Sequence, residues 1–166
     1  SSLAQLDGAD IVYVARVAVP KIITIAVRIG TRFPALQTSL GKVLLAALSP
    51  EELEKVLAEP SRSGINPLWK PDKAEYTRVL QEVRTKGWAL TDEHLAPGIR
   101  SVAAPVRDGS GGVVAALNIS VHAAETSLET LLGQYLPILL QTAAAISADW
   151  TLWQSRPEIV LTPNKS

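Results

Sequence analysis

The sequence predicts an α+β domain in which one antiparallel sheet packs against helices. Three observations support this class: strand-like alternation around the turn pair Asp7-Gly8, three consecutive helical patterns between residues 39 and 86, and a return to strands from Trp88. The strands form two runs separated by helices, which differs from the one-by-one alternation of a doubly wound parallel sheet. The length of 166 residues is that of a single domain.

The first part of the chain predicts three strands. Residues 1–17 alternate apolar and polar side chains on either side of Asp7-Gly8, and glycine tolerates the positive φ of a tight hairpin turn. Residues 22–29 are rich in β-branched side chains and predict a third strand that ends at Gly30. The following stretch, GTRFPA, predicts a turn.

Three helices are expected next. Apolar residues recur with helical spacing over residues 40–47, and Thr38 or Ser39 is placed to cap that helix. A second helix begins at Ser49-Pro50 with a capping-box glutamate, and a third runs from Asp72 to a glycine at residue 87. The intervening segment 60–71, rich in proline, serine and glycine, predicts an exposed loop.

Strands and one long helix complete the pattern. Residues 99–106 and 113–121 predict a hairpin through the turn sequence DGSGG. Residues 126–129, TSLE, have the spacing of a capping box that starts a long final helix, which Pro137 is expected to kink. We expect a domain over residues 1–153 and a poorly ordered tail over residues 154–166.

The composition excludes several classes of function. Sixteen basic and sixteen acidic residues cancel, which is unlike the basic surface of a domain that binds nucleic acid directly. Absence of cysteine removes thiol catalysis and thiolate metal sites, and two distant histidines do not form a metal site. Apolar runs are interrupted before the roughly 18 residues of a membrane span, so we expect a soluble, cytoplasmic chain without cofactor or metal. The sequence begins with Ser1 and contains no methionine, which suggests a part of a longer polypeptide.

Two short motifs admit a catalytic interpretation. Ser39-Leu40-Gly41-Lys42 has the S-x-x-K spacing of serine acyl-enzymes, in which the lysine assists the nucleophile. The companion motifs of those enzymes are absent, and a hydroxyl at a helix start is equally expected as a cap. Asp92-Glu93-His94 contains three titratable groups, but consecutive residues of an extended segment point to alternate sides and do not converge.

A third pattern resembles one wall of a small polar pocket. Within residues 113–121 the odd positions are apolar, whereas the even positions change from Val114 and Ala116 to Asn118 and Ser120. The neighbouring strand offers Ser101 with the same alternation. On alternation alone, a solvent-exposed end of the sheet is the simpler interpretation.

The chain resembles a known family along nearly its whole length. The matching segments are GTRFPALQTSLGKVLLAALSPEEL, GWALTDEHLAPGIRSVAAPVRDGSGGVVAALNIS and QYLPILLQTAAAIS. They contain in order an R-x-P-A turn, an S-x-G-K helix start, an E-x(4)-G-I-R-S-x-A-x-P strand and a G-x-V-x-A-A-L-x-x-S strand. These motifs resemble the C-terminal effector-binding domain of IclR-type bacterial transcriptional regulators, and the RFPA and PGIRSVAAPV matches resemble the branch that controls protocatechuate and related aromatic-acid pathways.

The resemblance implies a GAF-like, non-enzymatic ligand sensor. It further implies an N-terminal winged helix-turn-helix and linker helix, both outside this chain, through which the regulator binds DNA. Dimers that pair into tetramers are expected, with a small organic acid, either protocatechuate-like or glyoxylate- and pyruvate-like, that shifts operator affinity. The ligand would meet the first amide groups of the helix at Ser39, with Lys42 directed to solvent and Gly41 allowing close approach.

The resemblance also assigns residues to the pocket. An acidic residue stands at the position of Thr91 in glyoxylate-responsive members, so this chain departs from them there. Among the charged candidates Arg16, Arg32, His94 and Arg100, strand alternation directs Arg100 away from Ser101, and we favour Arg16 or His94 as the carboxylate partner. The expected lining residues are Ile22, Ile25, Phe33 and Ile99 on the apolar side, and Ser39, Leu40, Thr91, Ser101, Asn118 and Ser120 on the polar side.

Two further functions stay open at this point. One is a serine-lysine acyltransferase or hydrolase that uses Ser39 and Lys42. The other is a pure oligomerisation module whose pocket has lost its function.

Overall fold

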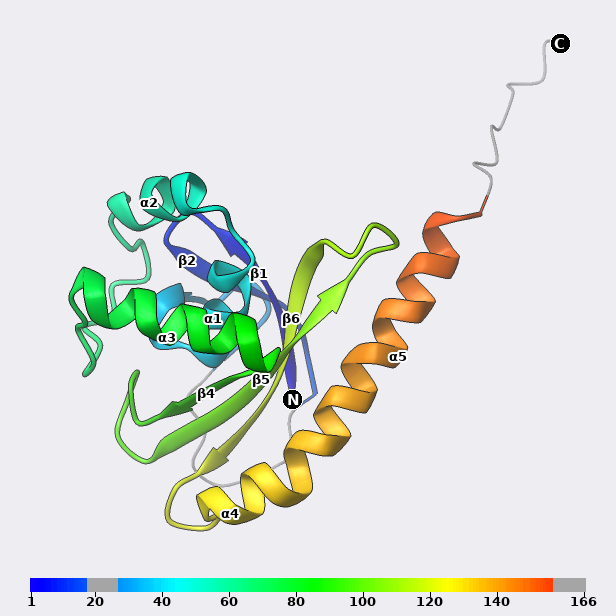
Figure 1. Cartoon of the computed structure of the whole chain (residues 1–166). Coiled ribbons are helices and arrows are strands. Elements are labelled where there is room, and N and C mark those ends of the chain that lie inside the picture. The colour runs from blue at the N-terminus through cyan, green and yellow to red at the C-terminus, as the bar shows by residue number, and fades with distance from the viewer. Residues whose placement is uncertain (18–26, 157–166) are drawn as a thin grey trace, which may run out of the picture.

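The computed structural model describes residues 1–17 and 27–156 and contains one curled, six-stranded antiparallel sheet packed with helices (Figure 1). The strand order β3-β2-β1-β6-β5-β4 brings the first strand of the chain beside the last one. This architecture confirms the predicted α+β class. The strands are β1 (Ser2–Asp7), β2 (Asp10–Arg16), β3 (Arg32–Pro34), β4 (Ala89–Asp92), β5 (Ile99–Arg107) and β6 (Val113–His122).

Both predicted hairpins are present. Gly8 turns the chain between β1 and β2 with a φ of 60°, a conformation that glycine adopts without strain. The turn between β5 and β6 is held by the Asp108 carboxylate, whose Oδ1 accepts from the amides of Ser110 at 2.9 Å and Gly112 at 3.0 Å. These local turn signals therefore set the two strand pairings on either side of the central β1–β6 pair.

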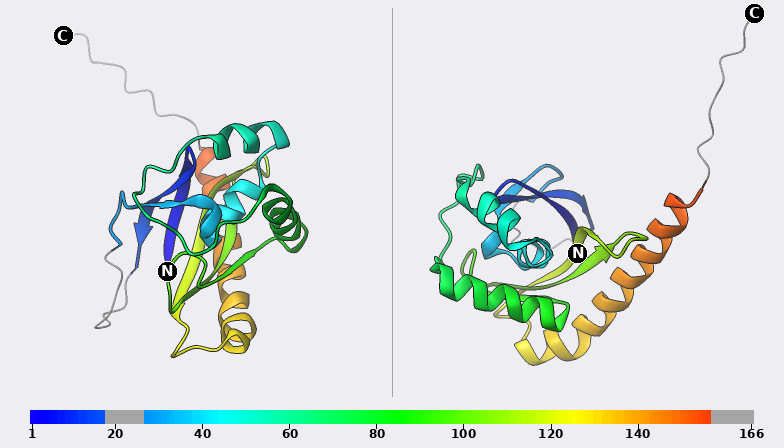
Figure 2. Two further views of the ribbon diagram at one scale, coloured as in Figure 1. Left: turned by 90° about the vertical axis from the view of Figure 1, so that its left-hand side faces the viewer. Right: turned by 45° about the horizontal axis from the view of Figure 1, so that its top comes forward.

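The helices cover both faces of the sheet. Figures 1 and 2 show α1, α2 and α3 on one side and the long α5 on the other. Leu40, Leu44 and Leu45 of α1 are buried in the larger of the two apolar clusters, and Leu131 and Leu139 of the final helix are buried in the other. The helical elements are η1 (Ala35–Gln37), α1 (Ser39–Ala46), α2 (Pro50–Ala58), α3 (Lys73–Lys86), α4 (Leu128–Thr130), η2 (Leu131–Tyr135) and α5 (Leu136–Gln154).

The first three helices begin at polar caps that the sequence predicts. Thr38, one of the two expected caps, accepts from the Gly41 amide, and Ser49 forms a full capping box with Glu52. Asp72 caps α3, which ends at Gly87 in the left-handed conformation. Side-chain oxygens and one glycine thus fix these helix boundaries.

Two boundaries differ from expectation. Residues 27–29 of the predicted third strand are not in a strand, and residues 22–26 lie outside the described residues. The segment predicted as a turn instead contains β3, because Phe33 pairs with Ile11 of β2. The final helix is capped by Ser127, whose hydroxyl accepts from the Thr130 amide at 3.1 Å, so the predicted capping box with residue 126 as the cap is wrong by one position.

Proline 137 is accommodated without breaking the final helix. Five residues before α5 form the π-helical turn η2, and the proline then occupies one of the first two positions of α5. Proline lacks the N–H group that an α-helix requires, and a wider turn in the preceding segment removes that requirement. The predicted disturbance is therefore present as a local π-turn. Residues 157–166 of the expected tail lie outside the described residues.

The combined helix Leu128–Gln154 is long and apolar enough to span a membrane, judged by length and composition only. Its most apolar window has a mean hydropathy of 1.3 and is 22% buried in the structure. The expectation that apolar runs are too short for a span is therefore wrong for this segment. A core helix of a soluble protein meets the same criterion, and here one side of the helix packs against β5 and β6.

Candidate ligand-binding site

A cavity of about 460 Å³ lies between the start of α1 and the polar ends of β4, β5 and β6. Its wall also includes residues of β1, β2 and β3, so every strand of the sheet contributes. The volume falls within the range of ~300–1,000 Å³ that is typical of small-molecule sites. Of the expected site residues, the wall contains Arg16, Phe33, Ser39, Thr91, Ile99, Ser101, Asn118 and Ser120.

Three buried hydroxyl groups form a connected chain on the polar wall. The Oγ atoms of Ser39 and Ser101 are 2.7 Å apart, and Ser101 Oγ lies 2.7 Å from Thr91 Oγ1. The sheet register explains the meeting, because Thr91 pairs with Ser101 across β4 and β5, and α1 begins above them. Hydroxyl groups both donate and accept hydrogen bonds, so these three side chains can reorient toward either a donor or an acceptor atom of a ligand.

Asn118 contributes an acceptor with no assigned partner. Its side chain is 3% exposed, and its Nδ2 donates to Ser120 Oγ at 3.0 Å. Its Oδ1 is buried and has no hydrogen-bond partner among residues 1–17 and 27–156. Buried polar atoms in folded proteins are almost always paired. A donor group placed in the cavity would satisfy this oxygen.

The opposite wall is apolar and includes two aromatic rings. Phe33 and Tyr13 meet edge to face, with ring centroids 5.7 Å apart and an interplanar angle of 87°. Leu95 and Ile99 extend the apolar surface. Burial raises the pKa of Tyr13 to about 12, so its phenol stays neutral and keeps its proton at physiological pH. This wall fits a flat or compact apolar group.

The first turn of α1 presents free amide groups beside the hydroxyl chain. Thr38 Oγ1 accepts from the Gly41 amide at 2.9 Å, and the Lys42 amide donates to the Thr38 carbonyl at 3.0 Å. The amides of Ser39 and Leu40 precede the first possible intrahelical acceptor. Helix starts carry partial positive charge, so this end of the cavity favours an anionic group.

Gly41 has a structural role that differs from the expected one. A Cβ atom at residue 41 would lie 2.0 Å from the carbonyl oxygen of Ala35. The absence of a side chain therefore allows α1 to pack on the turn η1. The close approach is between two backbone segments and does not involve the cavity.

Arg16 is the arginine that lines the cavity among residues 1–17 and 27–156. It ends β2, is half-buried, and forms no ion pair within the part of the chain that the structure describes. Burial, followed by the positive charge of Arg16, lowers the pKa of the amine of Ser1. An unneutralised guanidinium at the wall complements a carboxylate ligand.

His94, the other expected carboxylate partner, lies outside the cavity wall. Its Nδ1 is 2.8 Å from Lys42 Nζ, and its ring stacks on Trp69 with centroids 4.6 Å apart. Burial, followed by the positive charge of Lys42, lowers the pKa of His94 to about 4. A histidine that is neutral at pH 7 and engaged with a lysine is a poor partner for a carboxylate.

Lys42 is buried, which contradicts the expected solvent-facing orientation. Its exposure is 1%, and its Nζ contacts the carbonyl of Leu90 at 3.3 Å and the Trp69 ring at 4.6 Å from the centroid. Burial lowers its pKa to about 7. All eight residues of α1 are buried, because the sheet covers one side of the helix and α3 contacts another.

The S-x-x-K motif does not form a nucleophile and base pair in this structure. Ser39 Oγ bonds to Ser101, whereas Lys42 Nζ bonds to the β4 backbone and to His94. The Asp92-Glu93-His94 triplet is also separated, as predicted, since Glu93 accepts from the Gly98 amide at 2.9 Å. Within residues 1–17 and 27–156, no three His, Cys, Asp or Glu residues form a group suited to a metal ion.

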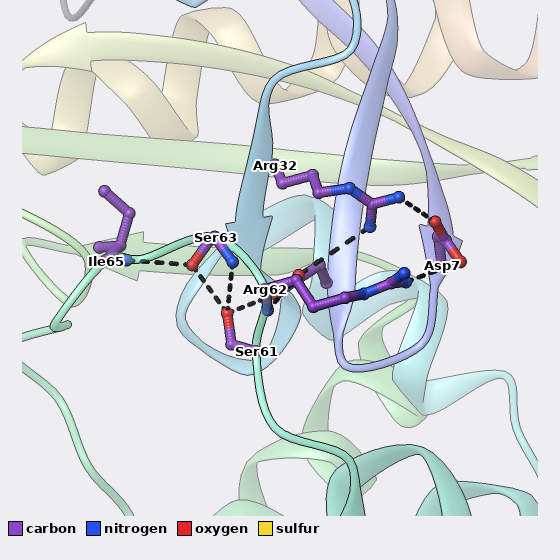
Figure 3. Close-up of polar contacts among 7 residues, drawn as sticks. Asp7, Arg32, Ser61, Arg62, Ser63 and Ile65 are labelled. Atoms are coloured by element: carbon purple, nitrogen blue, oxygen red, sulfur yellow. Dashed lines mark hydrogen bonds and ion pairs between the residues drawn. The ribbon is translucent and has the colours of Figure 1, made fainter.

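The remaining arginine candidates are engaged elsewhere. Arg100 pairs with Asp92 at 2.9 Å, consistent with the predicted orientation away from Ser101. Arg32 contacts the carboxylate of Asp7 at the β1–β2 turn, beside Arg62, as Figure 3 shows. Both arginines therefore hold strands and loops together at a distance from the cavity.

Two expected residues, Leu40 and His94, are not brought to the wall, and two others cannot be placed. Leu40 is fully buried in the apolar cluster around α1. Ile22 and Ile25 lie outside the described residues. Residues of the wall that the sequence did not predict include Ser2, Tyr13, Gln37, Leu95, Thr126 and Tyr135.

The unpredicted residues reach the wall through long-range pairings. Ser2 faces Asn118 because β1 pairs with β6, at a separation of more than a hundred residues. No local pattern indicates that pairing. For Tyr13, the alternation of the first hairpin was a usable signal, since it places this ring on the buried face.

Comparison with protein families identifies one match over most of the chain. The family model described as bacterial transcriptional regulator IclR C-terminal matches residues 1–148. The Pca regulon regulatory protein of Pseudomonas putida is 38% identical over 141 residues, which cover 84% of this chain and 48% of that protein. The chain spans about half the length of the curated relatives that it matches.

Solved structures share the fold. A putative transcriptional regulator, RHA06195 from Rhodococcus sp. RHA1, superposes with a TM-score of 0.83 at 44% identity, covering 91% of this chain and 61% of that chain. The inducer-binding domain of a PobR double mutant from Acinetobacter, in complex with 3-hydroxybenzoic acid, superposes with a TM-score of 0.77 at 29% identity. The match covers 88% of this chain and 86% of that chain.

Proposed function

Because the chain belongs to the IclR family of bacterial transcriptional regulators and corresponds to their C-terminal domain, we propose that its cavity binds a small aromatic acid. The observation that carries the proposal is the division of one cavity into a polar, electropositive end and an apolar aromatic wall. The complex of the related PobR domain with 3-hydroxybenzoic acid supports the same ligand class. The domain acts by binding, and we assign it no reaction.

The carboxylate of the ligand lies at the start of α1. There it accepts from the free amide of Ser39 and receives the charge of Arg16. A helix start favours a negative charge by about 0.3–1 kcal/mol, and by up to ~2 kcal/mol when partly buried. A charge-assisted bond to the guanidinium adds to this preference.

The ring packs against Phe33 and Ile99, and a ring hydroxyl donates to Asn118 Oδ1. This last contact supplies the donor that the buried amide oxygen lacks. It predicts a preference for hydroxylated benzoates over benzoate itself. A site that pairs a ligand hydroxyl discriminates strongly against the analogue without it, because the protein group is left unpaired.

Regulation of DNA binding requires a second state. A ligand shifts an equilibrium only by its difference in affinity for two arrangements, and allosteric couplings are typically ~1–3 kcal/mol. Ser2 of β1 pairs with Asn118 and lines the cavity, so a bound ligand would contact β1, the first strand of the sequence. We propose that this strand connects the effector to an N-terminal winged helix-turn-helix in a cytoplasmic regulator.

Isothermal titration calorimetry with 3-hydroxybenzoate, 4-hydroxybenzoate, protocatechuate, benzoate, glyoxylate and pyruvate tests the proposal. We expect at least one hydroxybenzoate to bind, and Asn118→Ala or Arg16→Ala to weaken it at least about tenfold. The matched control Thr85→Ala changes an exposed hydroxyl on α3 and should leave affinity unchanged. Absence of binding by all six acids to the folded wild-type chain would overturn the assignment.

A further inference from the structure

Hydrogen bonds attach the 60–71 loop, which joins α2 to α3, to the rest of the domain near each of its ends. At one end, Ser61 Oγ and the Arg62 amide donate to the buried carboxylate of Asp10 on β2, at 2.5 and 2.8 Å. Figure 3 shows Ser61 and Arg62 at this end of the loop. At the other end the loop is attached through Trp69.

The part of the loop between these two ends has little contact with the core. It contains neither helix nor strand, and the side chains of Ile65 and Leu68 are 42% and 59% exposed. Neither side chain belongs to the two apolar clusters formed by the described residues. Segments with few buried apolar contacts open locally, without unfolding the rest of a domain. The attachment at Trp69 can therefore break while the sheet stays folded.

Trp69 contacts three helical elements and the loop that follows β4. Its amide donates to the His94 carbonyl at 3.0 Å, and its ring stacks on the His94 ring with centroids 4.6 Å apart. Lys42 Nζ of α1 lies 4.6 Å from the centroid of the Trp69 ring, and the indole Nε1 donates to Glu75 of α3 at 3.0 Å. The Trp69 carbonyl accepts from Gln37 Nε2 of η1 at 3.2 Å. One residue thus joins η1, α1, α3 and the loop after β4.

Two of these contacts reach the cavity wall from behind. Gln37 is 9% exposed and lines the cavity, so the Trp69 carbonyl holds the amide of a wall residue. His94 directly precedes Leu95, which belongs to the apolar wall. Trp69 itself is not a lining residue among the described part of the chain. Its effect on a bound ligand would therefore pass through Gln37 and Leu95.

We propose that Trp69 is a positioning residue for the effector: the docked 60–71 loop holds Gln37 and Leu95 in the cavity wall, and an occupied cavity in turn favours the docked loop. This inference rests on the proposed function, the binding of a small aromatic acid in the cavity. A wall that is already ordered loses less freedom when a ligand binds, which raises affinity without a new contact. Because the coupling is reciprocal, the ligand stabilises docking by the same factor.

The size of the effect follows from the fraction of molecules in which the loop is docked. If only the docked form binds the ligand, the apparent Kd equals the intrinsic Kd divided by that fraction. Removal of the Trp69 ring takes away its stack on His94 and its contact with Lys42. We therefore expect Trp69→Ala to lower the docked fraction, and with it the affinity, at least about tenfold.

Isothermal titration calorimetry with 3-hydroxybenzoate, 4-hydroxybenzoate and protocatechuate tests the effect of docking on affinity. Trp69→Ala should weaken each acid that binds the wild type at least about tenfold. Trp69→Phe keeps an aromatic ring over His94 and should restore most of the affinity. The control Trp153→Ala removes an exposed tryptophan of α5 and should leave the affinity unchanged. Far-UV circular dichroism and thermal unfolding establish that each variant is folded.

Hydrogen exchange measured by NMR tests the reciprocal effect of the ligand on docking. The amide proton of Trp69, which is donated to the His94 carbonyl, exchanges with solvent when this end of the loop opens. With a bound acid at ten times its Kd, this exchange should slow about tenfold. The control is the Arg62 amide at the other end of the loop, where exchange should slow much less, since it donates to Asp10.

A measurement without ligand separates the role of Trp69 in the wall from the identity of the effector. NMR of the free chain gives the order parameter of the Leu95 methyl groups and the exchange rate of the Gln37 side-chain amide protons. Trp69→Ala should lower this order parameter and speed this exchange, because the wall loses its support. Trp69→Phe should leave both close to their wild-type values.

Three outcomes would overturn the proposal. These are wild-type affinity in Trp69→Ala for an acid that binds, equal slowing of exchange at the Trp69 and Arg62 amides, and an unchanged wall in ligand-free Trp69→Ala. If none of the three acids binds the wild type, the proposed effector fails together with its coupling to the loop. The ligand-free measurement then still decides whether Trp69 holds the wall, so the two failures are distinguishable.

Discussion

Replacement of Lys42 by methionine should abolish a specific pH dependence of stability. The side chain is 1% exposed and its ammonium group contacts Trp69, His94 and the Leu90 carbonyl, with Glu82 as the carboxylate that raises its pKa. Burial is the larger effect and lowers the pKa from 10.5 to about 7. Methionine has a similar length and no charge to bury.

The sign of the dependence follows from proton counts. Between pH 7 and 10.5 the unfolded chain holds a proton on Lys42 that the folded chain has released, so rising pH stabilises the folded state. A full proton difference corresponds to about 1.4 kcal/mol per pH unit. Between pH 7 and 9 the wild type should therefore gain about 2 kcal/mol from this group. The contact with Trp69 favours the charged form and sets this figure as an upper estimate.

Urea unfolding at a series of pH values from 6 to 9 measures the effect. Lys42→Met should flatten the slope and be more stable than the wild type at pH 7, since replacing a buried charge by an apolar group is often stabilising. The control Lys70→Met changes an exposed lysine and should retain the wild-type slope. An unchanged slope in Lys42→Met, or a flat wild-type profile, would refute the burial argument.

Two further substitutions test packing and a buried carboxylate. Gly41→Ala should destabilise the domain by at least about 3 kcal/mol in thermal or urea unfolding, because its Cβ would lie 2.0 Å from the Ala35 carbonyl oxygen; a stable, soluble variant would show that the contact is relaxed in solution. Asp10→Asn should cost about 2 kcal/mol, since the 1% exposed carboxylate accepts from Ser61 Oγ at 2.5 Å and the Arg62 amide at 2.8 Å. Because these two bonds hold the 60–71 loop, Asp10→Asn should also speed proteolysis of that loop. An unchanged cleavage rate would contradict a role of Asp10 in holding the loop.

The sequence predicts elements well where a local chemical rule decides. The hydroxyl and carboxylate caps at Thr38, Ser49 and Asp72 start helices, and the glycine-containing turns set two hairpins. Each rule requires only neighbouring residues. By contrast, the sequence predicts a turn where the structure has β3. This strand has only three residues, too few to show a strand pattern, and it forms by pairing with β2.

The polar wall shows the limit of alternation. The even positions of β6 correctly placed Asn118 and Ser120 on one face, but alternation alone favoured a solvent-exposed end of the sheet. The face is covered because the start of α1 lies above it, where Ser39 meets Ser101. That meeting joins residues 62 positions apart, and only the tertiary fold provides it.

Lys42 illustrates a different limit. Helical periodicity assigns one face of α1 to the core and leaves the other to solvent, which directs a lysine outward. This helix has no solvent side: the sheet covers one face, and α3 together with the ring of Trp69 covers another. A lysine in such a helix must find acceptors, and it does so at the Leu90 carbonyl and His94. The same pairing keeps His94 off the cavity wall, so that of the two expected carboxylate partners only Arg16 lines the cavity. The burial of Lys42 therefore explains both its wrongly predicted orientation and the choice between the two partners.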